Sequence, residues 1–164
     1  MSSQANEGAV GVDVHPPVQA AAVLRQAGTL VHSGGGTRPL LAGKQLALLS
    51  PDCTDDAALA FIDAAKSLGA RVSFVQAGLD DASSDAQVDT TARLLGQLYD
   101  AVECQHLPPA LVQRIARSAG IPVFEGLATA GHPTAALVQQ LDAGVSAQVR
   151  RRCVLQAALL VSMG

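Results

Sequence analysis

The chain has 164 residues, of which 49% are hydrophobic but only 2% aromatic, and its formal net charge is −3. This length predicts one domain with a core of its own, and the apolar fraction excludes a disordered chain. Because the few aromatic side chains and the acidic balance offer neither a base-stacking surface nor a basic field, we expect no nucleic-acid partner.

The same sequence predicts a cytoplasmic protein with no membrane partner. Its longest apolar runs, near residues 46–49 and 155–161, are far shorter than the ~18 residues of a membrane span. Residues 1–14 lack the basic region and apolar stretch of a secretory signal. Three widely spaced cysteines favour reduced thiols over a disulfide framework; they are Cys53, Cys104 and Cys153.

Two regions are expected along the chain. Residues 1–16 are small and polar and predict a flexible N-terminal arm, whereas residues 17–164 form a single domain without internal repeats. An Ala-rich segment from Val18 to Val31 predicts the first helix, which the glycines after Ser33 end.

Four short apolar runs follow, with amphipathic segments between them. Their starts lie about 20 to 30 residues apart, the spacing of strand, crossover helix and strand, and near-continuous apolar runs are typical of parallel strands covered on both faces. The sequence therefore predicts an α/β fold, a three-layer open sheet of about four parallel strands with helices on both faces. The strands are expected at Gln45–Ser50, Arg71–Gln76, Ala101–Gln105 and Ile121–Glu125.

Turn and capping residues delimit five further helices. Asp52 or Thr54 is expected to cap the first of them, and prolines at the favoured first turn, Pro109 and Pro133, to open two others. The expected helices begin and end near residues 54–69, 85–99, 108–120, 132–141 and 147–162. Ligands of an open α/β sheet bind outside the carboxyl ends of its strands, here residues 50–54, 76–85, 105–107 and 126–132.

The last of these loops carries a recognisable motif. The segment Gly126-Leu-Ala-Thr-Ala-Gly-His132-Pro133-Thr134 resembles the aspartate and ornithine carbamoyltransferases, in which a His-Pro-Thr/Cys-Gln motif opens a helix. The resemblance extends in both directions: residues 41–49 are similar to the family's first strand, 61–69 to the helix after its phosphate loop, and 91–102 to the helix and strand that follow.

This resemblance covers essentially the whole chain but only half of the family's architecture. The family joins a carbamoyl-phosphate domain to an amino-acid domain and closes with a helix that returns to the first domain. Residues 148–160 resemble that returning helix, yet they follow Leu141 and Asp142 almost at once, so the amino-acid domain is expected to be absent. Family members trimerise through the retained domain, which implies a homo-oligomer, a trimer as in the family, or a hetero-complex with a metabolic enzyme.

Most of the family's phosphate-binding residues are replaced. Where the family has Ser-Thr-Arg-Thr-Arg at the start of its second helix, this chain has Thr54-Asp55-Asp56-Ala57-Ala58. Asp55 and Asp56 stabilise a helix start through the helix dipole, but they repel a phosphate there. A family arginine at the end of the third strand falls on Gln105, and the motif's glutamine falls on Ala135.

Two positions keep residue types that match the family. Thr54 keeps a hydroxyl, and His132 corresponds to the histidine that helps to polarise the carbamoyl oxygen in the family. The family's mobile loop falls on Gly78–Gln87, which is acidic and has no lysine. The chain alone is therefore predicted to be inactive, with no residue assigned to catalysis. The ligand-cleft candidates are Thr54, Asp55, Asp56, Gln105, His132 and Pro133.

Other constellations favour structural roles. Zinc prefers cysteine and histidine, but Cys53, Cys104, His106 and His132 match no short zinc motif, and strand alternation places Cys104 and His106 on one face with Gln105 on the other. We expect no metal and no cofactor. No nucleophile-elbow sequence supports a Ser-His-Asp triad. The run Arg150–Arg152 predicts a solvated or carboxylate-paired helix face.

Two functions stay open. The first is a non-catalytic, carbamoyltransferase-like protein of amino-acid metabolism that has lost carbamoyl-phosphate binding and acts as an oligomeric or partner subunit. The second is a small-molecule-binding protein, or an enzyme of changed specificity, that takes a neutral or cationic ligand in the same cleft.

Overall fold

A single parallel sheet organises the chain. The computed structural model describes residues 17–34 and 38–163, so the arm predicted for residues 1–16 lies outside the described residues. The strand order is β2-β1-β3-β4, and every neighbouring pair is parallel. The α/β prediction is confirmed, with strand limits within two residues of those expected. The strands are β1 (Gln45–Leu49), β2 (Arg71–Val75), β3 (Ala101–Cys104) and β4 (Val123–Glu125).

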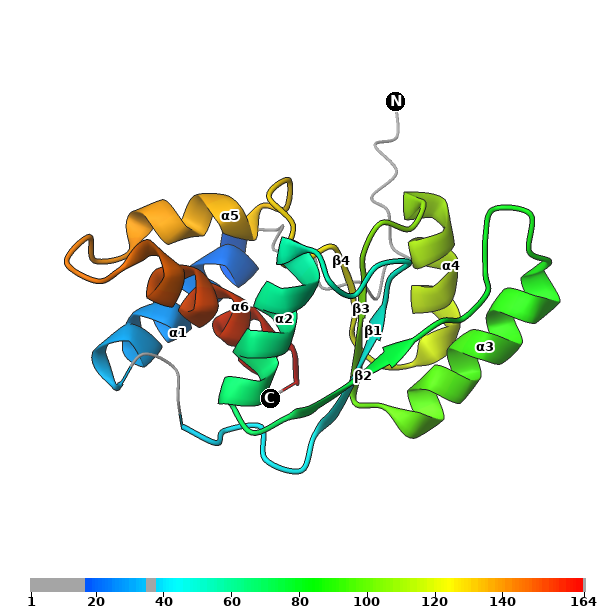
Figure 1. Ribbon diagram of the computed structural model, residues 1–164, viewed down its shortest axis with the longest axis horizontal. Coiled ribbons are helices and arrows are strands. Elements are labelled where there is room, and N and C mark those ends of the chain that lie inside the picture. Colours follow the sequence, from blue (N-terminus) through cyan, green and yellow to red (C-terminus); the bar gives the residue numbers. More distant parts are fainter. Residues whose placement is uncertain (1–16, 35–37, 164) are drawn as a thin grey trace.

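Helices cover both faces of the sheet, as Figure 1 shows. The helices α1, α2, α5 and α6 lie on one face, where α6 packs against both α1 and α2, and α3 and α4 lie on the other. Their bounds are α1 (Pro17–His32), α2 (Asp56–Ser67), α3 (Asp85–Leu98), α4 (Pro109–Ala119), α5 (Thr134–Leu137) and α6 (Ala147–Met163). None of the helices within the described ranges is both long and apolar enough to cross a membrane.

The core is aliphatic and divided by the sheet. One cluster joins the sheet to α1, α2 and α6 and includes Phe61, Phe124 and Leu159; the other joins it to α3 and α4 and includes Val88 and Ile115. Each fully buried side chain of this size stabilises the fold by about 1.5–3 kcal/mol relative to exposure.

The close packing of α3 on α4 requires a glycine. A Cβ atom at Gly96 would lie 1.9 Å from the carbonyl oxygen of Ala119. Only a residue without a side chain lets these two helices approach so closely.

Two local predictions are wrong. Asp55, not Asp52 or Thr54, caps α2, because Thr54 uses the Asp52 carboxylate for its own N–H and hydroxyl. The helix expected over residues 132–141 is only α5 followed by a 3-10 turn, Val138–Gln140. The Val138 carbonyl accepts from Leu141 N and from Arg150 Nη1, which leaves it unavailable for a further α-helical turn.

Candidate functional site

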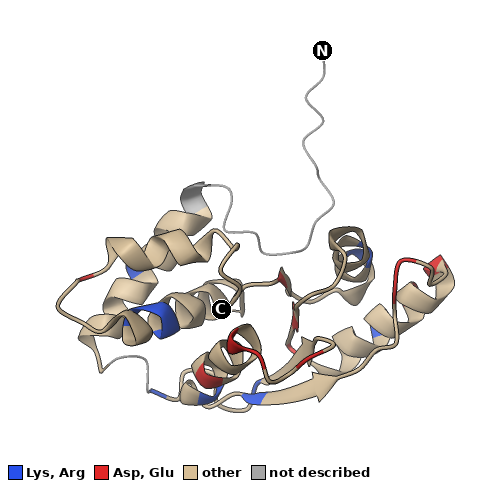
Figure 2. Cartoon of the chain, turned by 45° about the horizontal axis from the view of Figure 1, so that its top comes forward, with Lys and Arg blue, Asp and Glu red and all other residues tan. Residues whose placement is uncertain are grey.

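A pocket of about 480 Å³ lies beside the carboxyl ends of β3 and β4. We call it the α2/α6 pocket: its walls are the first turn of α2, the loop 127–130, the α5 segment and α6. Most of the wall is aliphatic, including Leu127, Val138 and Val154, and Asp56 and Arg151 supply charge from opposite elements. Figure 2 shows acidic residues at the start of α2 and basic residues on α6.

The carboxylate of Asp55 caps the N-terminus of α2. Asp55 Oδ1 accepts from Ala58 N at 2.8 Å, and Asp55 Oδ2 pairs with His106 Nε2. The Ala58 N–H, and then the His106 hydrogen bond, hold the pKa of Asp55 below its usual value. His106 also adopts φ 58°, a left-handed conformation uncommon outside glycine. The anion-binding end of this helix is therefore already filled.

Strand alternation does not extend to His106. Cys104 packs toward α3 and α4, and Gln105 points to the opposite face, as predicted. His106, however, does not share the face of Cys104, because β3 ends at Cys104 and the left-handed turn directs the imidazole to Asp55 at the start of α2.

Thr54 lies exposed just outside the α2 cap. Its hydroxyl donates to Asp52 Oδ1 at 2.6 Å and its backbone N–H to the same oxygen at 2.8 Å. The hydroxyl bond, followed by the backbone bond, lowers the pKa of Asp52. The hydroxyl proton of Thr54 is thus engaged within the loop.

Gln105 is fully buried and holds two elements together. Its Nε2 donates to the Ala57 carbonyl at 3.1 Å and to Glu103 Oε2 at 3.2 Å. Among the described residues, its carboxamide oxygen has no hydrogen-bond partner. Gln105 therefore connects the end of β3 to the first turn of α2 by hydrogen bonds and carries no charge.

Glu103 is a site residue that sequence reasoning missed. It is fully buried, and its carboxylate accepts from Leu127 N at 3.0 Å and from Ala128 N at 3.2 Å. Burial raises the pKa of Glu103 to about 7, although these hydrogen bonds oppose the rise. The available signal was one acidic residue within the apolar run Ala101–Cys104.

His132 and Pro133 shape the start of α5. The His132 ring is buried, and its Nδ1 lies 3.2 Å from Thr134 N and 3.0 Å from Thr134 Oγ1. Pro133 occupies the N-cap position and offers no side-chain cap. Thr134 and Ala135, rather than these two residues, line the α2/α6 pocket.

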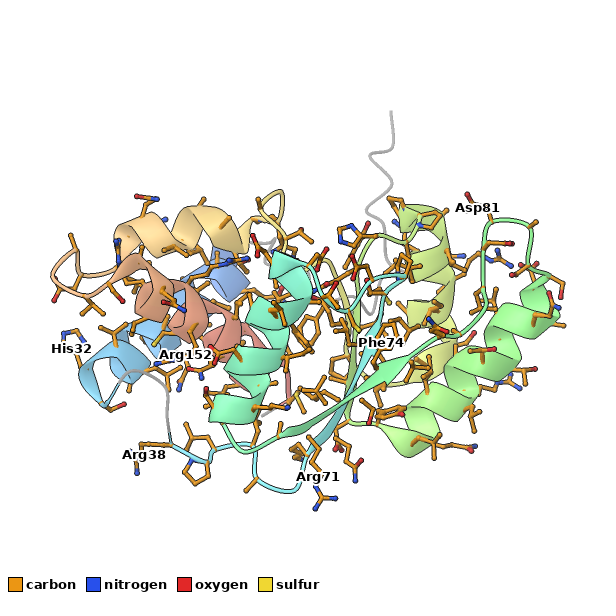
Figure 3. All side chains as sticks on the ribbon, viewed as in Figure 1. His32, Arg38, Arg71, Phe74, Asp81 and Arg152 are labelled. Carbon is orange, nitrogen blue, oxygen red and sulfur yellow. The ribbon has the colours of Figure 1, made fainter. Side chains whose placement is uncertain are left out.

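The three arginines of α6 fasten that helix to its surroundings. Arg150 donates to the carbonyls of Val145 and Val138, and Arg151 Nη2 donates to the Ala128 carbonyl at 2.7 Å. Arg152 approaches Asp63 of α2 at 3.9 Å, and Figure 3 shows it on α6. The sequence Arg150–Arg152 predicts a basic face on this helix, but the sequence alone did not show that Arg151 lines the pocket.

The acidic loop before α3 lies away from this pocket. Asp80 Oδ1 accepts from Ala82 N, Ser84 and Gln87 form a capping box, and Asp85 pairs with Arg114 of α4 at 2.7 Å. Figure 3 places Asp81 at the outer end of the loop. These contacts give the loop a local structural role.

In the part of the chain that the structure describes, no three His, Cys, Asp or Glu side chains are arranged so that they could hold a metal ion. Cys53 is half-buried, while Cys104 is buried and its thiol pKa is raised by burial. A protonated thiol is a poor metal ligand.

The parallel sheet, the helix start beside it and the His-Pro loop form an α/β domain with a pocket beside the carboxyl ends of its strands. Residues 12–142 match the family model of the aspartate/ornithine carbamoyltransferase, carbamoyl-P binding domain. The chain belongs to this family. The match ends before α6.

The curated relatives are much longer than this chain. The ornithine carbamoyltransferase of Cutibacterium acnes is 35% identical over 107 residues, which are 65% of this chain and 32% of the relative. The catabolic ornithine carbamoyltransferase of Haemophilus influenzae is 34% identical over the same shares. This chain therefore spans about a third of the length of these curated relatives.

Solved structures show the same fold. The ornithine carbamoyltransferase from Pyrococcus furiosus has a TM-score of 0.63 at 24% identity, covering 85% of this chain and 45% of that one. The enzyme from Gloeobacter violaceus has a TM-score of 0.58 at 24% identity, covering 80% of this chain and 42% of that one.

Proposed function

We propose that this chain is a non-catalytic carbamoyltransferase-like protein that has lost carbamoyl-phosphate binding. The observation that supports this proposal is the capping of α2 by Asp55, whose carboxylate occupies the helix end that attracts anions. A phosphate would have to displace a carboxylate that already has two partners.

Electrostatics at the helix start oppose a phosphate further. Asp56 adds a second acidic group in the first turn of α2, and Gln105 supplies no positive charge from β3. Two like unit charges 4 Å apart near a protein surface repel by about 4 kcal/mol. Carbamoyl transfer needs cationic or hydrogen-bonding groups where negative charge develops. This arrangement places negative charge there instead.

The role that remains is assembly. The proposal includes a homo-oligomer, a trimer as in the family, or a hetero-complex with an enzyme of amino-acid metabolism, in the cytoplasm. The absence of an amino-acid domain belongs to the same proposal, and it rests on how soon residues 148–160 follow Asp142.

An enzyme assay and a mass measurement test the two halves of this proposal. The chain is mixed with carbamoyl phosphate and either ornithine or aspartate, beside a complete ornithine carbamoyltransferase as the positive control. We expect no carbamoylated product from the chain and an oligomeric mass by light scattering. Product formation would refute the loss of catalysis, and a monomer at every concentration would refute the homo-oligomer.

The α2/α6 pocket supports a second candidate function. Its aliphatic walls and the exposed carboxylate of Asp56 suit a neutral or cationic small molecule, and Arg151 adds a counter-charge for a ligand that also carries an acid. Thermal-shift measurements with amines, amino acids and carbamoyl phosphate test it. A stabilising amine should lose its effect in Asp56→Asn but keep it in Asp81→Asn, a change at the outer loop. No stabilisation by any amine or amino acid would exclude this candidate.

A further inference from the structure

Glu103 lies where three segments of the site meet. It belongs to β3, and its register neighbours are Leu48 of β1 and Phe124 of β4, both buried. A carboxylate in such a place has no solvent to stabilise its charge, so it depends on hydrogen bonds from the protein.

Those hydrogen bonds connect α2 to the wall of the pocket. Leu127 N donates to Glu103 Oε1, while Ala128 N and Gln105 Nε2 donate to Oε2, at 3.0–3.2 Å. The same Gln105 nitrogen donates to the Ala57 carbonyl in the first turn of α2. Leu127, Ala128 and Ala57 all line the α2/α6 pocket. The carboxylate therefore holds two walls of one pocket at a fixed separation.

The charge of Glu103 is not neutralised by any of the ion pairs among the described residues. The charged and titratable groups nearest to it along these elements come from five places. They are Cys104 on β3 and His106 just after it, Asp55 and Asp56 at the start of α2, Arg151 of α6, Glu125 of β4, and His132 in the loop after β4. Arg151 donates to the Ala128 carbonyl rather than to the carboxylate, and His106 pairs with Asp55. Gln105, where the family has an arginine, brings a hydrogen bond but no charge.

We propose that Glu103 is a proton-operated latch for the α2/α6 pocket. The ionised carboxylate holds residues 127–128 against α2 through its hydrogen bonds. When one proton binds a carboxylate oxygen, the group loses its negative charge and accepts hydrogen bonds more weakly, so its contacts to the N–H groups of Leu127 and Ala128 weaken and the loop loosens. This latch acts whether or not the chain has lost carbamoyl-phosphate binding.

The transition falls near neutrality, because burial raises the pKa of Glu103 to about 7. Hydrogen bonds to a charged group are stronger than neutral ones, so protonation weakens the contact to Leu127 and Ala128. Relative to the intrinsic exchange rate at the same pH, the protection of their amide hydrogens should fall below the transition, by about tenfold for each charge-assisted bond lost.

Nuclear magnetic resonance of the isotopically labelled full chain tests this latch. The side-chain carboxyl carbon of Glu103 and the amide signals of Leu127 and Ala128 are followed from acid to alkaline pH. We expect one shared midpoint near pH 7. A carboxyl carbon that stays ionised throughout this range would overturn the proposal without the need for any variant.

Variants separate Glu103 from the nearby histidines. Glu103→Gln should abolish the titration of the Leu127 and Ala128 amides, whereas His132→Asn and His106→Asn should leave it in place. Gln105→Arg puts a cation beside the carboxylate and should lower the midpoint. If the amide titration persists in Glu103→Gln or disappears in either histidine variant, the latch is wrong.

Discussion

The carboxylate of Asp55 and the imidazole of His106 pair across the start of α2, joining the loop after β1 to the loop after β3. The pair uses one oxygen of Asp55 while the other caps the helix, so a single side chain closes the helix end and connects two strand-end loops.

Removing the Asp55 side chain, which caps α2, should lower the free energy of unfolding more than removing the neighbouring Asp56 side chain. Asp55→Ala loses the hydrogen bond from Ala58 N, and we expect the free energy of unfolding to fall by about 1 kcal/mol. Asp56→Ala removes only a favourable charge in the first turn and should cost about 0.3 kcal/mol. Urea denaturation of both variants at neutral pH measures the difference. Equal losses would show that Asp55 is not the cap.

The same pair makes the fold sensitive to acid. The pKa of Asp55 is lowered below 3.8 by the Ala58 N–H and then by His106, so its stabilising contribution is complete above 3.8 and is lost as pH falls through the lowered value. Asp55→Ala should therefore show a shallower loss of stability below pH 3.8 than the parent chain. Identical acid denaturation curves would contradict this assignment.

The left-handed backbone at His106 predicts an unusual rank order. His106→Gly and His106→Ala both remove the contact with Asp55, but only glycine adopts φ 58° without strain. We expect the glycine variant to be more stable than the alanine variant by about 1 kcal/mol in thermal or urea denaturation. An alanine variant as stable as the glycine variant would exclude strain at this position.

Glu103 should make the folded state less stable as pH rises. Its pKa is about 7 in the fold against 4.5 when unperturbed, so the folded chain binds more protons between these values, and stability falls from pH 4.5 through about 7. The loss approaches about 3 kcal/mol, since each tenfold change in proton affinity corresponds to about 1.4 kcal/mol. Glu103→Gln should flatten this dependence between pH 5 and 8. A variant with the parent's slope would assign the effect to another group.

Two glycine-to-alanine variants test the close packing of α3 on α4, one at the contact and one away from it as its control. Gly96→Ala forces the new Cβ against the Ala119 carbonyl and should destabilise the chain by about 1–3 kcal/mol. Gly28→Ala, in α1 with no atom within 4 Å of the new Cβ, should stabilise it by up to about 1 kcal/mol through helix propensity. A neutral Gly96→Ala would mean that α3 and α4 lie farther apart.

The periodicity of apolar residues was enough to locate most strands and helices in the sequence, because each of these elements depends on residues close together in the chain. The four strands and the long helices were predicted from such patterns, and the open-sheet rule directed attention to the loops at the carboxyl ends of the strands. The cap of α2 was misassigned because Asp52, Thr54 and Asp55 compete locally for the same backbone groups, and only the folded loop shows which one reaches Ala58 N.

The connections within the site depend on residues far apart in the chain. Glu103 meets Leu127 across 24 positions, and Gln105 meets Ala57 across 48. No local pattern encodes such contacts, so the sequence identified Gln105 as a replaced arginine but did not show that its side chain turns inward to Glu103. The strand order β2-β1-β3-β4 and the position of Arg151 at the pocket belong to the same class of unpredicted features.

Isothermal titration of the full chain with carbamoyl phosphate at neutral pH tests whether the anion site is lost, with a complete ornithine carbamoyltransferase measured in the same buffer. We predict no detectable binding heat for this chain, because Asp55 occupies the helix end and Gln105 supplies no charge. Micromolar binding by the parent chain would contradict the account and show that the anion site is retained.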